Sequence, residues 1–172
     1  MQTLAPASRA DQTRALGLST IAFTACFAVW TIFSIIGVAI KDELGLNDTQ
    51  FGLLVATPVL TGSLVRIFLG VWTERYGGRI VYSAQMLLTA LATWALTLAD
   101  SYPMYLLAAL GVGLAGGSFI IGVAYVSRWY DMSQQGTALG IFGAGNVGAA
   151  VTKFLAPFVM VAFGWYGVAY VW

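Results

Sequence analysis

Long runs of apolar residues alternate with short polar segments along most of this chain. An α-helix needs about 20 mostly apolar residues to cross the hydrocarbon core of a bilayer. Five runs approach or exceed that length and predict membrane-spanning helices at about residues 16–40, 51–72, 80–98, 102–126 and 136–163. The runs are continuous and do not alternate with polar positions, so they favour helices over the strands of a membrane barrel.

The polar segments between the runs are short, so neighbouring helices should be antiparallel and belong to one bundle. The polar stretch at residues 1–15 predicts a cytoplasmic tail, and residues 16–172 predict a single transmembrane unit. A sixth apolar run begins near Gly164 and stops at Trp172, far short of a full span. We therefore expect an all-α membrane protein with five complete helices and the start of a sixth, as a fragment of a longer protein.

The charges in the loops predict how the bundle is oriented. Cytoplasmic loops of membrane proteins carry an excess of lysine and arginine. The segments before the first helix, after the second and after the fourth carry five cations, namely Arg9, Arg14, Arg75, Arg79 and Arg128. The segments on the other side carry Lys41 as their only cation. This asymmetry predicts a cytoplasmic N-terminus.

Composition excludes several classes of function. Of the 172 residues, 59% are hydrophobic and 9% are charged, whereas soluble domains carry about 25% charged residues. This excludes a soluble enzyme and a disordered chain, and the net charge of +1 without a basic block excludes a nucleic-acid binder. With no histidine and one cysteine, Cys26, the chain has no histidine-ligated metal site, histidine-based catalyst or internal disulfide. We expect no metal, no cofactor and no enzymatic activity.

Two cations fall inside predicted spans, where a charge costs at least about 2.5–3.5 kcal/mol near the bilayer centre. The first is Arg66, which interrupts the second span. One interpretation is a guanidinium group that faces a cavity and binds an anion. The other is snorkelling, because the span ends at Trp72, roughly 9 Å further along a helix, and the long side chain could reach the interface.

The second cation, Lys153, lies near the middle of the fifth span, too deep to reach the interface easily. Asn146 lies two helical turns earlier on the same face, so the pair predicts a polar stripe that lines an anion path. The alternative is a buried lysine capped by backbone carbonyls of a neighbouring helix. No acidic residue lies within a predicted span, so an anionic ligand, or acids outside this chain, would have to balance these cations.

Glycines crowd the last two predicted spans. They are Gly111, Gly113, Gly116, Gly117 and Gly122 in the fourth and Gly136, Gly140, Gly143, Gly145 and Gly148 in the fifth. Spacings of four let helices approach closely, and packing explains most of these residues. The cluster from Gly143 to Gly148 is denser than packing needs, and it predicts backbone contact with a small planar ligand or a sliding contact between helices. Phe119, beside the first group, either packs in the core or stacks on a flat ligand.

Two motifs carry a family resemblance. The segment Gly70-Val-Trp-Thr-Glu74-Arg75-Tyr-Gly77-Gly-Arg79 resembles the loop signature between the second and third helices of the major facilitator superfamily, with Glu74 where aspartate is usual. The segment from Gln135 to Gly148, followed by Ala156-Pro157, resembles the nitrate signature of the nitrate/nitrite porter family. Gly117-Ser-Phe119 and the segment around Arg66 are also similar to that family, and the resemblance runs from about Ala22 onward.

This resemblance implies twelve helices in two halves, of which this chain is most of the first half-bundle. It implies that Arg66 contacts the substrate anion, that Phe119 packs against it and that Asn146 supports the site. It also implies that helices rearrange at the signature glycines Gly140, Gly143, Gly145 and Gly148. Lys153 departs from the exchanger pattern and is more similar to the proton-symport branch.

The sequence therefore predicts a secondary transporter of nitrate, and of nitrite, that works by alternating access in a bacterial inner membrane. Protons are the expected coupling ion, nitrate assimilation the expected role, and the C-terminal half of the same transporter the expected partner. Three alternatives stay open: exchange of nitrate for nitrite, a transporter of this superfamily for another small anion, and a non-transporting membrane subunit.

Overall fold

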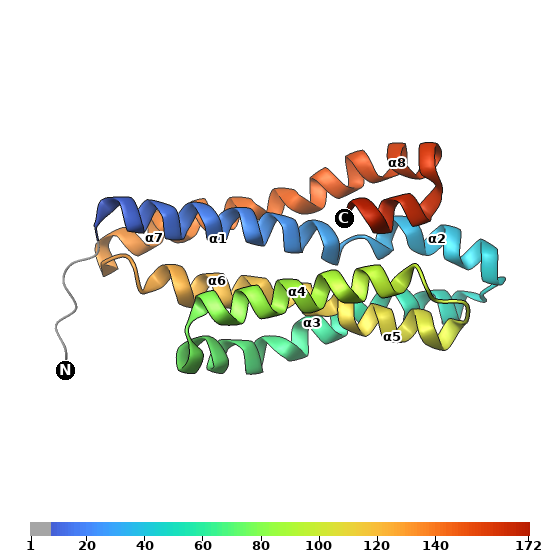
Figure 1. The fold of residues 1–172 in the computed structure, drawn as a ribbon, viewed down its shortest axis with the longest axis horizontal. Coiled ribbons are helices and arrows are strands. Elements are labelled where there is room, and N and C mark those ends of the chain that lie inside the picture. The colour runs from blue at the N-terminus through green and yellow to red at the C-terminus, as the bar shows by residue number, and fades with distance from the viewer. Residues whose placement is uncertain (1–7) are drawn as a thin grey trace.

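A computed structural model describes residues 8–172 as a bundle of helices along one long axis (Figure 1). No strand is present within these residues. The α-helices are α1 (Arg9–Trp30), α2 (Phe33–Leu44), α3 (Asp48–Tyr76), α4 (Gly78–Leu96), α5 (Tyr102–Gly113), α6 (Ser118–Ser127), α7 (Met132–Gly143) and α8 (Val147–Val171). Two short 3-10 helices, η1 (Leu114–Gly117) and η2 (Ala144–Asn146), join α5 to α6 and α7 to α8. The predicted all-α fold is confirmed.

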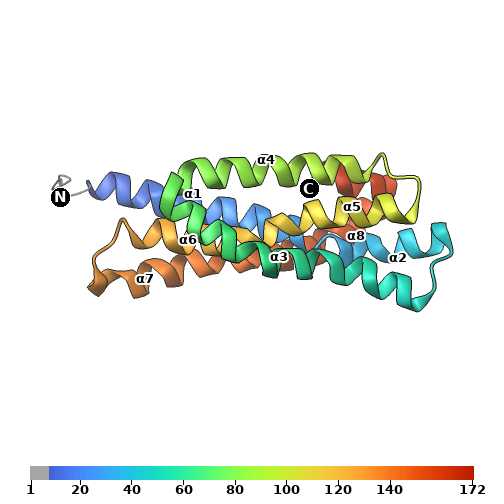
Figure 2. The same cartoon turned by 90° about the horizontal axis from the view of Figure 1, so that it is seen from below.

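Each predicted span corresponds to helix in the structure, and within residues 8–172 four segments could cross a membrane by length and composition. These are Arg9–Leu44, Asp48–Tyr76, Tyr102–Ser127 and Met132–Val171. The exception is α4, which covers most of the predicted span at 80–98. It is long enough, with 19 residues, but Gln85, Thr89 and Thr93 lower its hydropathy. These three side chains are buried inside the bundle. The helix packs against α5 and α3 (Figure 2), so α4 is part of the same bundle as the other spans.

The first span begins earlier than predicted and is divided in two. Ser8 caps α1, because its Oγ accepts a hydrogen bond from the Asp11 backbone N–H at 3.1 Å. The helix therefore begins at Arg9, while residues 1–7 of the predicted tail lie outside the described residues. The span is interrupted between Trp30, where α1 ends, and Phe33, where α2 begins. The continuous apolar run did not indicate this break.

The apolar run that follows Gly164 turns back against the bundle. Gly164 has φ +71° and interrupts α8, a backbone conformation that favours glycine. Beyond it, Trp165 Nε1 donates to Glu43 Oε2 at 2.8 Å and Trp172 Nε1 donates to Thr152 Oγ1 at 2.6 Å. The reversal is visible at the red end of the ribbon (Figure 1).

Small residues bring α3 close to the fourth span at the middle of the bundle. A Cβ atom added at Gly113 would lie 2.8 Å from the Pro58 carbonyl oxygen, and one added at Gly62 would lie 2.9 Å from the Gly113 carbonyl oxygen. A side chain at either position would displace backbone. Both residues therefore let two backbones approach, which is the packing role that the glycine spacing predicted for the fourth span.

The charged segments lie at opposite ends of the bundle. The start of α1, the α3–α4 turn and the α6–α7 turn share one end (Figure 1), and they carry Arg9, Arg14, Arg75, Arg79 and Arg128. At the other end, Lys41 Nζ forms an ion pair with Asp48 Oδ1 at 2.7 Å. Folding therefore gathers the five cations whose position predicts the cytoplasmic side.

Candidate functional site

Arg66 extends from α3 toward the middle of the fourth span. Its Nε donates a hydrogen bond to the Gly116 carbonyl oxygen at 3.0 Å, and its Cζ lies 5.6 Å from the ring centroid of Trp30. Within residues 8–172 its two Nη groups have no hydrogen-bond or ion-pair partner. The side chain crosses to η1 and does not follow α3 toward Trp72, so the geometry is not that of a snorkelling arginine. The half-buried guanidinium group is therefore held through Nε, while the edge formed by the two Nη groups has no partner in residues 8–172.

Trp30 is a neighbour of this site that the sequence did not single out. Its Nε1 donates to the Pro58 carbonyl oxygen at 2.9 Å. The ring occupies space that two glycines leave, because a Cβ atom at Gly62 or at Gly116 would lie 2.9 Å from Nε1. Its position in the sequence could have indicated this role, because Trp30 lies within a predicted span, whereas Trp72 and Trp129 lie at span ends.

Phe119 lies one helical turn beyond the residue that accepts the Arg66 hydrogen bond. Its side chain is 38% exposed. Its ring centroid lies 5.6 Å from that of Phe23 and 6.0 Å from that of Phe142. Phe23 and Phe27 are 5.4 Å apart, and Phe27 and Trp30 are 5.3 Å apart. This aromatic row, Trp30, Phe27, Phe23 and Phe119, connects Arg66 to Phe119.

Asn146 and Lys153 share an exposed stripe on the fifth span, but they do not contact Arg66. The Asn146 side chain is exposed and its Nδ2 donates to the Gly143 carbonyl oxygen at 2.8 Å. Lys153 is exposed and has no hydrogen-bond or ion-pair partner in the described part of the chain. Within residues 8–172 no carbonyl of a neighbouring helix caps Lys153. Arg66 contacts Gly116 and Trp30, Phe119 packs on Phe23 and Phe142, and Asn146 and Lys153 lie on the exposed stripe.

The signature glycines divide between a packed face and an open face. A Cβ atom at Gly148 would overlap the Thr24 carbonyl oxygen, and one at Gly145 would meet the Phe23 ring. A Cβ atom at Gly140 or Gly143 would have nothing within 4 Å. The 3-10 helix η2 begins directly after Gly143 and contains Gly145, and such an interruption inside a longer helix often marks a hinge. Only half of the signature is explained by packing within this chain.

The loop motif ties two helix ends to the end of α6. Gly77 has φ +88°, which allows the tight turn from α3 to α4. Arg128 Nη2 lies 3.7 Å from Glu74 Oε1 and donates to the Glu74 carbonyl oxygen at 3.3 Å. Arg79 Nε donates to Tyr125 Oη at 3.1 Å.

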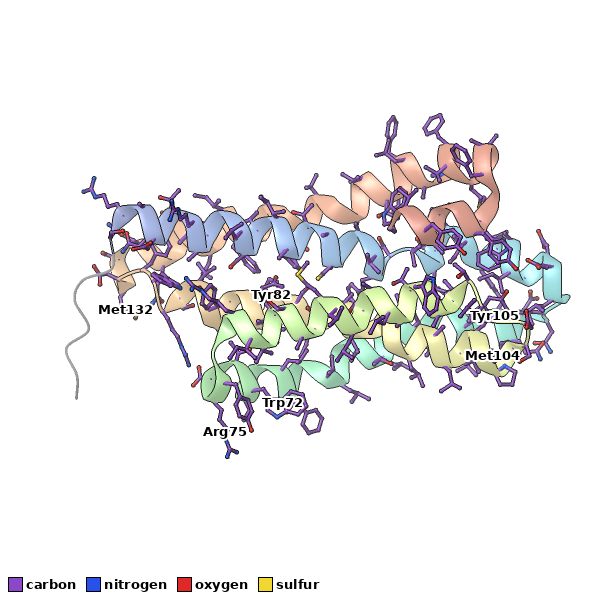
Figure 3. The ribbon with its side chains drawn as sticks, in the orientation of Figure 1. Trp72, Arg75, Tyr82, Met104, Tyr105 and Met132 are labelled. Carbon is purple, nitrogen blue, oxygen red and sulfur yellow. The ribbon has the colours of Figure 1, made fainter. Side chains whose placement is uncertain are left out.

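Of the remaining two motif residues, Gly70 packs against a neighbouring helix and Arg75 is exposed. A Cβ atom at Gly70 would lie 3.5 Å from Ile120, in ordinary packing distance. Arg75 is exposed, points away from the bundle (Figure 3) and has its Cζ 5.4 Å from the Tyr76 ring centroid. The motif therefore joins α3, α4 and α6 through Glu74 and Arg79, while Arg75 is free to meet another surface.

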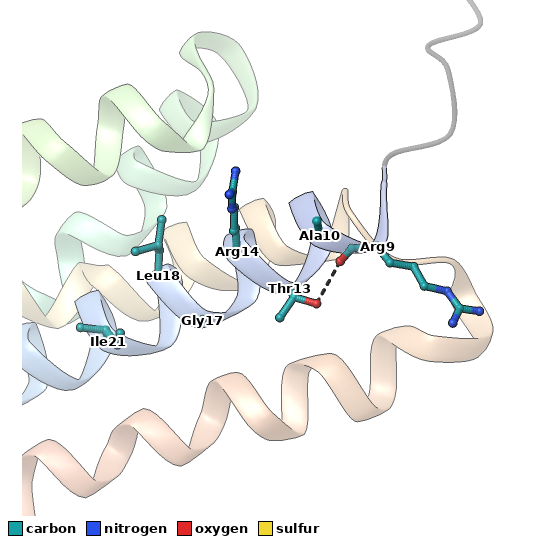
Figure 4. Close-up of a pocket in the computed structure, with 7 residues that line it drawn as sticks. All are labelled: Arg9, Ala10, Thr13, Arg14, Gly17, Leu18 and Ile21. Atoms are coloured by element: carbon teal, nitrogen blue, oxygen red, sulfur yellow. Dashed lines mark hydrogen bonds between the residues drawn. The ribbon is translucent and has the colours of Figure 1, made fainter.

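A surface hollow of about 590 Å³ lies away from these residues, along the N-terminal half of α1 (Figure 4). Its lining includes Arg9, Thr13, Arg14 and Leu18. The Thr13 hydroxyl is already used within the helix, since Oγ1 donates to the Arg9 carbonyl oxygen at 2.9 Å. The hollow has no convergent polar groups toward a ligand. Arg66 and Phe119 are not part of it.

Taken together, the helices and the cation held within them define a multi-pass membrane protein. Residues 18–172 match the family model described as "Major Facilitator Superfamily". The chain belongs to the major facilitator superfamily, as the loop motif predicted, and its similarity to the nitrate/nitrite porters of that superfamily is confirmed by the curated proteins that it matches.

The similar proteins include three bacterial transporters. The chain is 48% identical over 149 residues to "Probable nitrate/nitrite antiporter NarK1" of Thermus thermophilus, covering 87% of this chain and 34% of that protein. It is 35% identical over 150 residues to "Nitrite extrusion protein" of Bacillus subtilis (87% and 38%). It is 32% identical over 150 residues to "Probable nitrate transporter NarT" of Staphylococcus carnosus (87% and 39%). The chain thus spans between a third and two fifths of the length of these relatives.

Proposed function

We propose that the full-length protein containing this chain is a secondary transporter that moves nitrate, and nitrite, across a bacterial inner membrane. The observation that carries this proposal is the half-buried guanidinium group of Arg66, which is held at Nε while both Nη groups have no partner within residues 8–172. The printed names of the similar proteins, which concern nitrate and nitrite, support the same class of ligand. The segregated cations support a cytoplasmic N-terminus.

In this proposal, the free edge of Arg66 donates two parallel hydrogen bonds to two oxygens of the anion. A planar guanidinium matches a planar oxyanion in this way, whereas an ammonium acts as a point charge. Phe119 covers the face of the anion from the same side of the bundle. The second half of the transporter closes the site from the opposite side, and rocking of the two halves around it gives alternating access.

The open stripe of the fifth span has a separate role in the proposal. Gly140 and Gly143 leave a surface without neighbours, and Asn146 and Lys153 lie along it. This surface would meet the second half, and η2 would allow the helix to bend as the halves move. Asn146 then supports the site from a helix that moves, and Lys153 adds positive potential along the anion path.

Substrate choice can be tested by competition between anions. Full-length transporter in proteoliposomes should take up labelled nitrate in a saturable way, and nitrite should compete with it. Sulfate should compete poorly, because a tetrahedral dianion does not fit between a planar fork and an aromatic ring. Strong competition by sulfate or phosphate would indicate a transporter for another small anion, and no flux at all would indicate a non-transporting subunit.

The proposal also concerns the energy source for anion uptake. Moving one anion into an inside-negative cell costs about 2.3 kcal/mol per 100 mV, so uptake needs a cotransported cation or the exit of another anion. No acidic residue lies within the predicted spans of this chain, which leaves Lys153 as the candidate proton carrier. We favour proton-coupled nitrate uptake. Nitrate/nitrite exchange is the second candidate, favoured by the printed name of the relative from Thermus thermophilus.

Substitution of Lys153 tests this coupling. Lys153→Gln should weaken uptake driven by a pH gradient more than exchange against internal nitrite, because an amide cannot carry the proton. Lys153→Arg should uncouple as well, since guanidinium keeps its proton throughout. Both rates are measured in proteoliposomes of the full-length protein. Full proton-driven uptake by Lys153→Gln would exclude Lys153 as the carrier and favour exchange.

A further inference from the structure

We propose that Trp30 is a positioning residue for Arg66, which fixes the direction in which the free edge of the guanidinium group points. The inference rests on the proposed function, because it concerns how the same arginine receives its anion. Trp30 comes from α1, whereas Arg66 comes from α3 and its hydrogen-bond acceptor from η1. The position of one side chain therefore depends on three segments of the chain.

Trp30 itself is held rigidly in this arrangement. Its indole N–H donates to the Pro58 carbonyl oxygen at 2.9 Å, which fixes the ring against α3. Gly62 and Gly116 lie against the ring, and a Cβ atom at Gly116 would be 2.8 Å from its Cε2. Phe27 packs beside it, with ring centroids 5.3 Å apart. The indole fills a space left by two glycines and has little freedom to rotate.

This rigid ring restricts the guanidinium group from a second side. The Gly116 carbonyl oxygen determines where Nε points, at 3.0 Å. A single hydrogen bond still permits rotation about its own direction. The Trp30 ring, 5.6 Å from Cζ, attracts the cation to its π face and removes that rotation. Neither contact uses the two Nη groups, which have no protein partner in residues 8–172.

The consequence is a preorganised fork. An arginine side chain loses considerable rotamer freedom when it is immobilised by a ligand, and affinity improves when that freedom is lost beforehand. Trp30 performs this task without needing to contact the anion. Removing its ring should therefore weaken nitrate binding while leaving the number of hydrogen bonds to nitrate unchanged.

The experiment compares two replacements of Trp30 in the full-length transporter. Trp30→Leu removes the aromatic ring, whereas Trp30→Phe keeps a smaller aromatic ring that lacks the indole N–H. Nitrate uptake is measured in proteoliposomes. Trp30→Leu should raise KM for nitrate about tenfold, and Trp30→Phe should raise it no more than about threefold. The maximal rate should change less than KM in both variants.

Two controls separate positioning from a general structural effect. Trp94→Leu makes the same replacement at a tryptophan on α4 that is 53% exposed, and its KM should equal that of the unsubstituted protein. Midpoints of thermal unfolding are measured for all variants. If Trp30→Leu does not reach the membrane, Trp30→Met serves as the variant without a ring.

Equal KM values for the phenylalanine and leucine variants, whether raised or not, would overturn the role of the Trp30 ring. Failure of the proposed function gives a different result. In that case Arg66→Lys would transport nitrate with an unchanged KM. Loss of transport in Arg66→Lys together with an unchanged KM in Trp30→Leu would refute only the positioning role.

Discussion

Replacing Arg66 by lysine is expected to lower nitrate transport about 10- to 100-fold, although the positive charge is kept. Arg66 uses Nε to bond the Gly116 carbonyl oxygen at 3.0 Å and keeps two Nη groups free. A lysine ammonium cannot hold that carbonyl and also present two parallel donors to a planar anion. The loss should appear in initial rates of labelled nitrate uptake by proteoliposomes of the full-length protein.

The matched control is Arg9→Lys, which makes the same replacement at an exposed position at the start of α1. Its transport should be close to that of the unsubstituted protein, because it contacts no part of the site. Comparable amounts of each variant in the membrane must be confirmed before rates are compared. Normal nitrate uptake by membrane-inserted Arg66→Lys would refute the assignment of Arg66 as the anion site.

The second large effect is expected at Gly148, where α8 packs against α1. A Cβ atom there would overlap the Thr24 carbonyl oxygen and would lie 2.9 Å from the Ala28 nitrogen. Both are backbone atoms of a helix, so they cannot move aside as a side chain can. Gly148→Ala should destabilise the protein by about 1–3 kcal/mol. The midpoint of thermal unfolding of the full-length protein in detergent measures this loss.

Gly140→Ala is the matched control within the same signature. A Cβ atom at this position has nothing within 4 Å in the described structure, and alanine is the better helix former by about 1 kcal/mol. Its unfolding midpoint should be unchanged or slightly higher. If the open face meets the second half, transport by Gly140→Ala should nevertheless fall. Equal loss of stability in both variants would contradict the division of the signature into a packed and an open face.

The helices were predictable from the sequence because apolar runs of membrane length leave the chain few alternatives. The positions at which these helices are interrupted were harder to predict. The break after Trp30 occurs within an unbroken apolar run, and a hydropathy pattern does not indicate where a helix bends. The sequence marks Gly164 only as the start of a sixth apolar run, yet its positive φ of 71° accompanies a reversal of the chain. Backbone geometry of this kind depends on neighbouring helices.

The candidate site was predictable in part. A cation inside a span is costly, so Arg66 and Lys153 stood out from the sequence alone. Helical spacing also indicated that Asn146 and Lys153 share a face. What the sequence did not contain was the meeting of Arg66 with Gly116 and Trp30, three residues from different spans. Trp30 was missed because an aromatic residue in an apolar helix is most often part of the packing.

Equilibrium binding of nitrate to the purified full-length protein tests the central claim, that this half-bundle provides an anion site at Arg66. Calorimetric titration in detergent should give saturable nitrate binding that nitrite displaces. The same titration of Arg66→Lys should give binding weaker by at least about tenfold, under conditions in which thermal unfolding shows that both proteins are folded. Equal nitrate affinity in the two proteins, or no saturable binding by the unsubstituted one, would contradict the account.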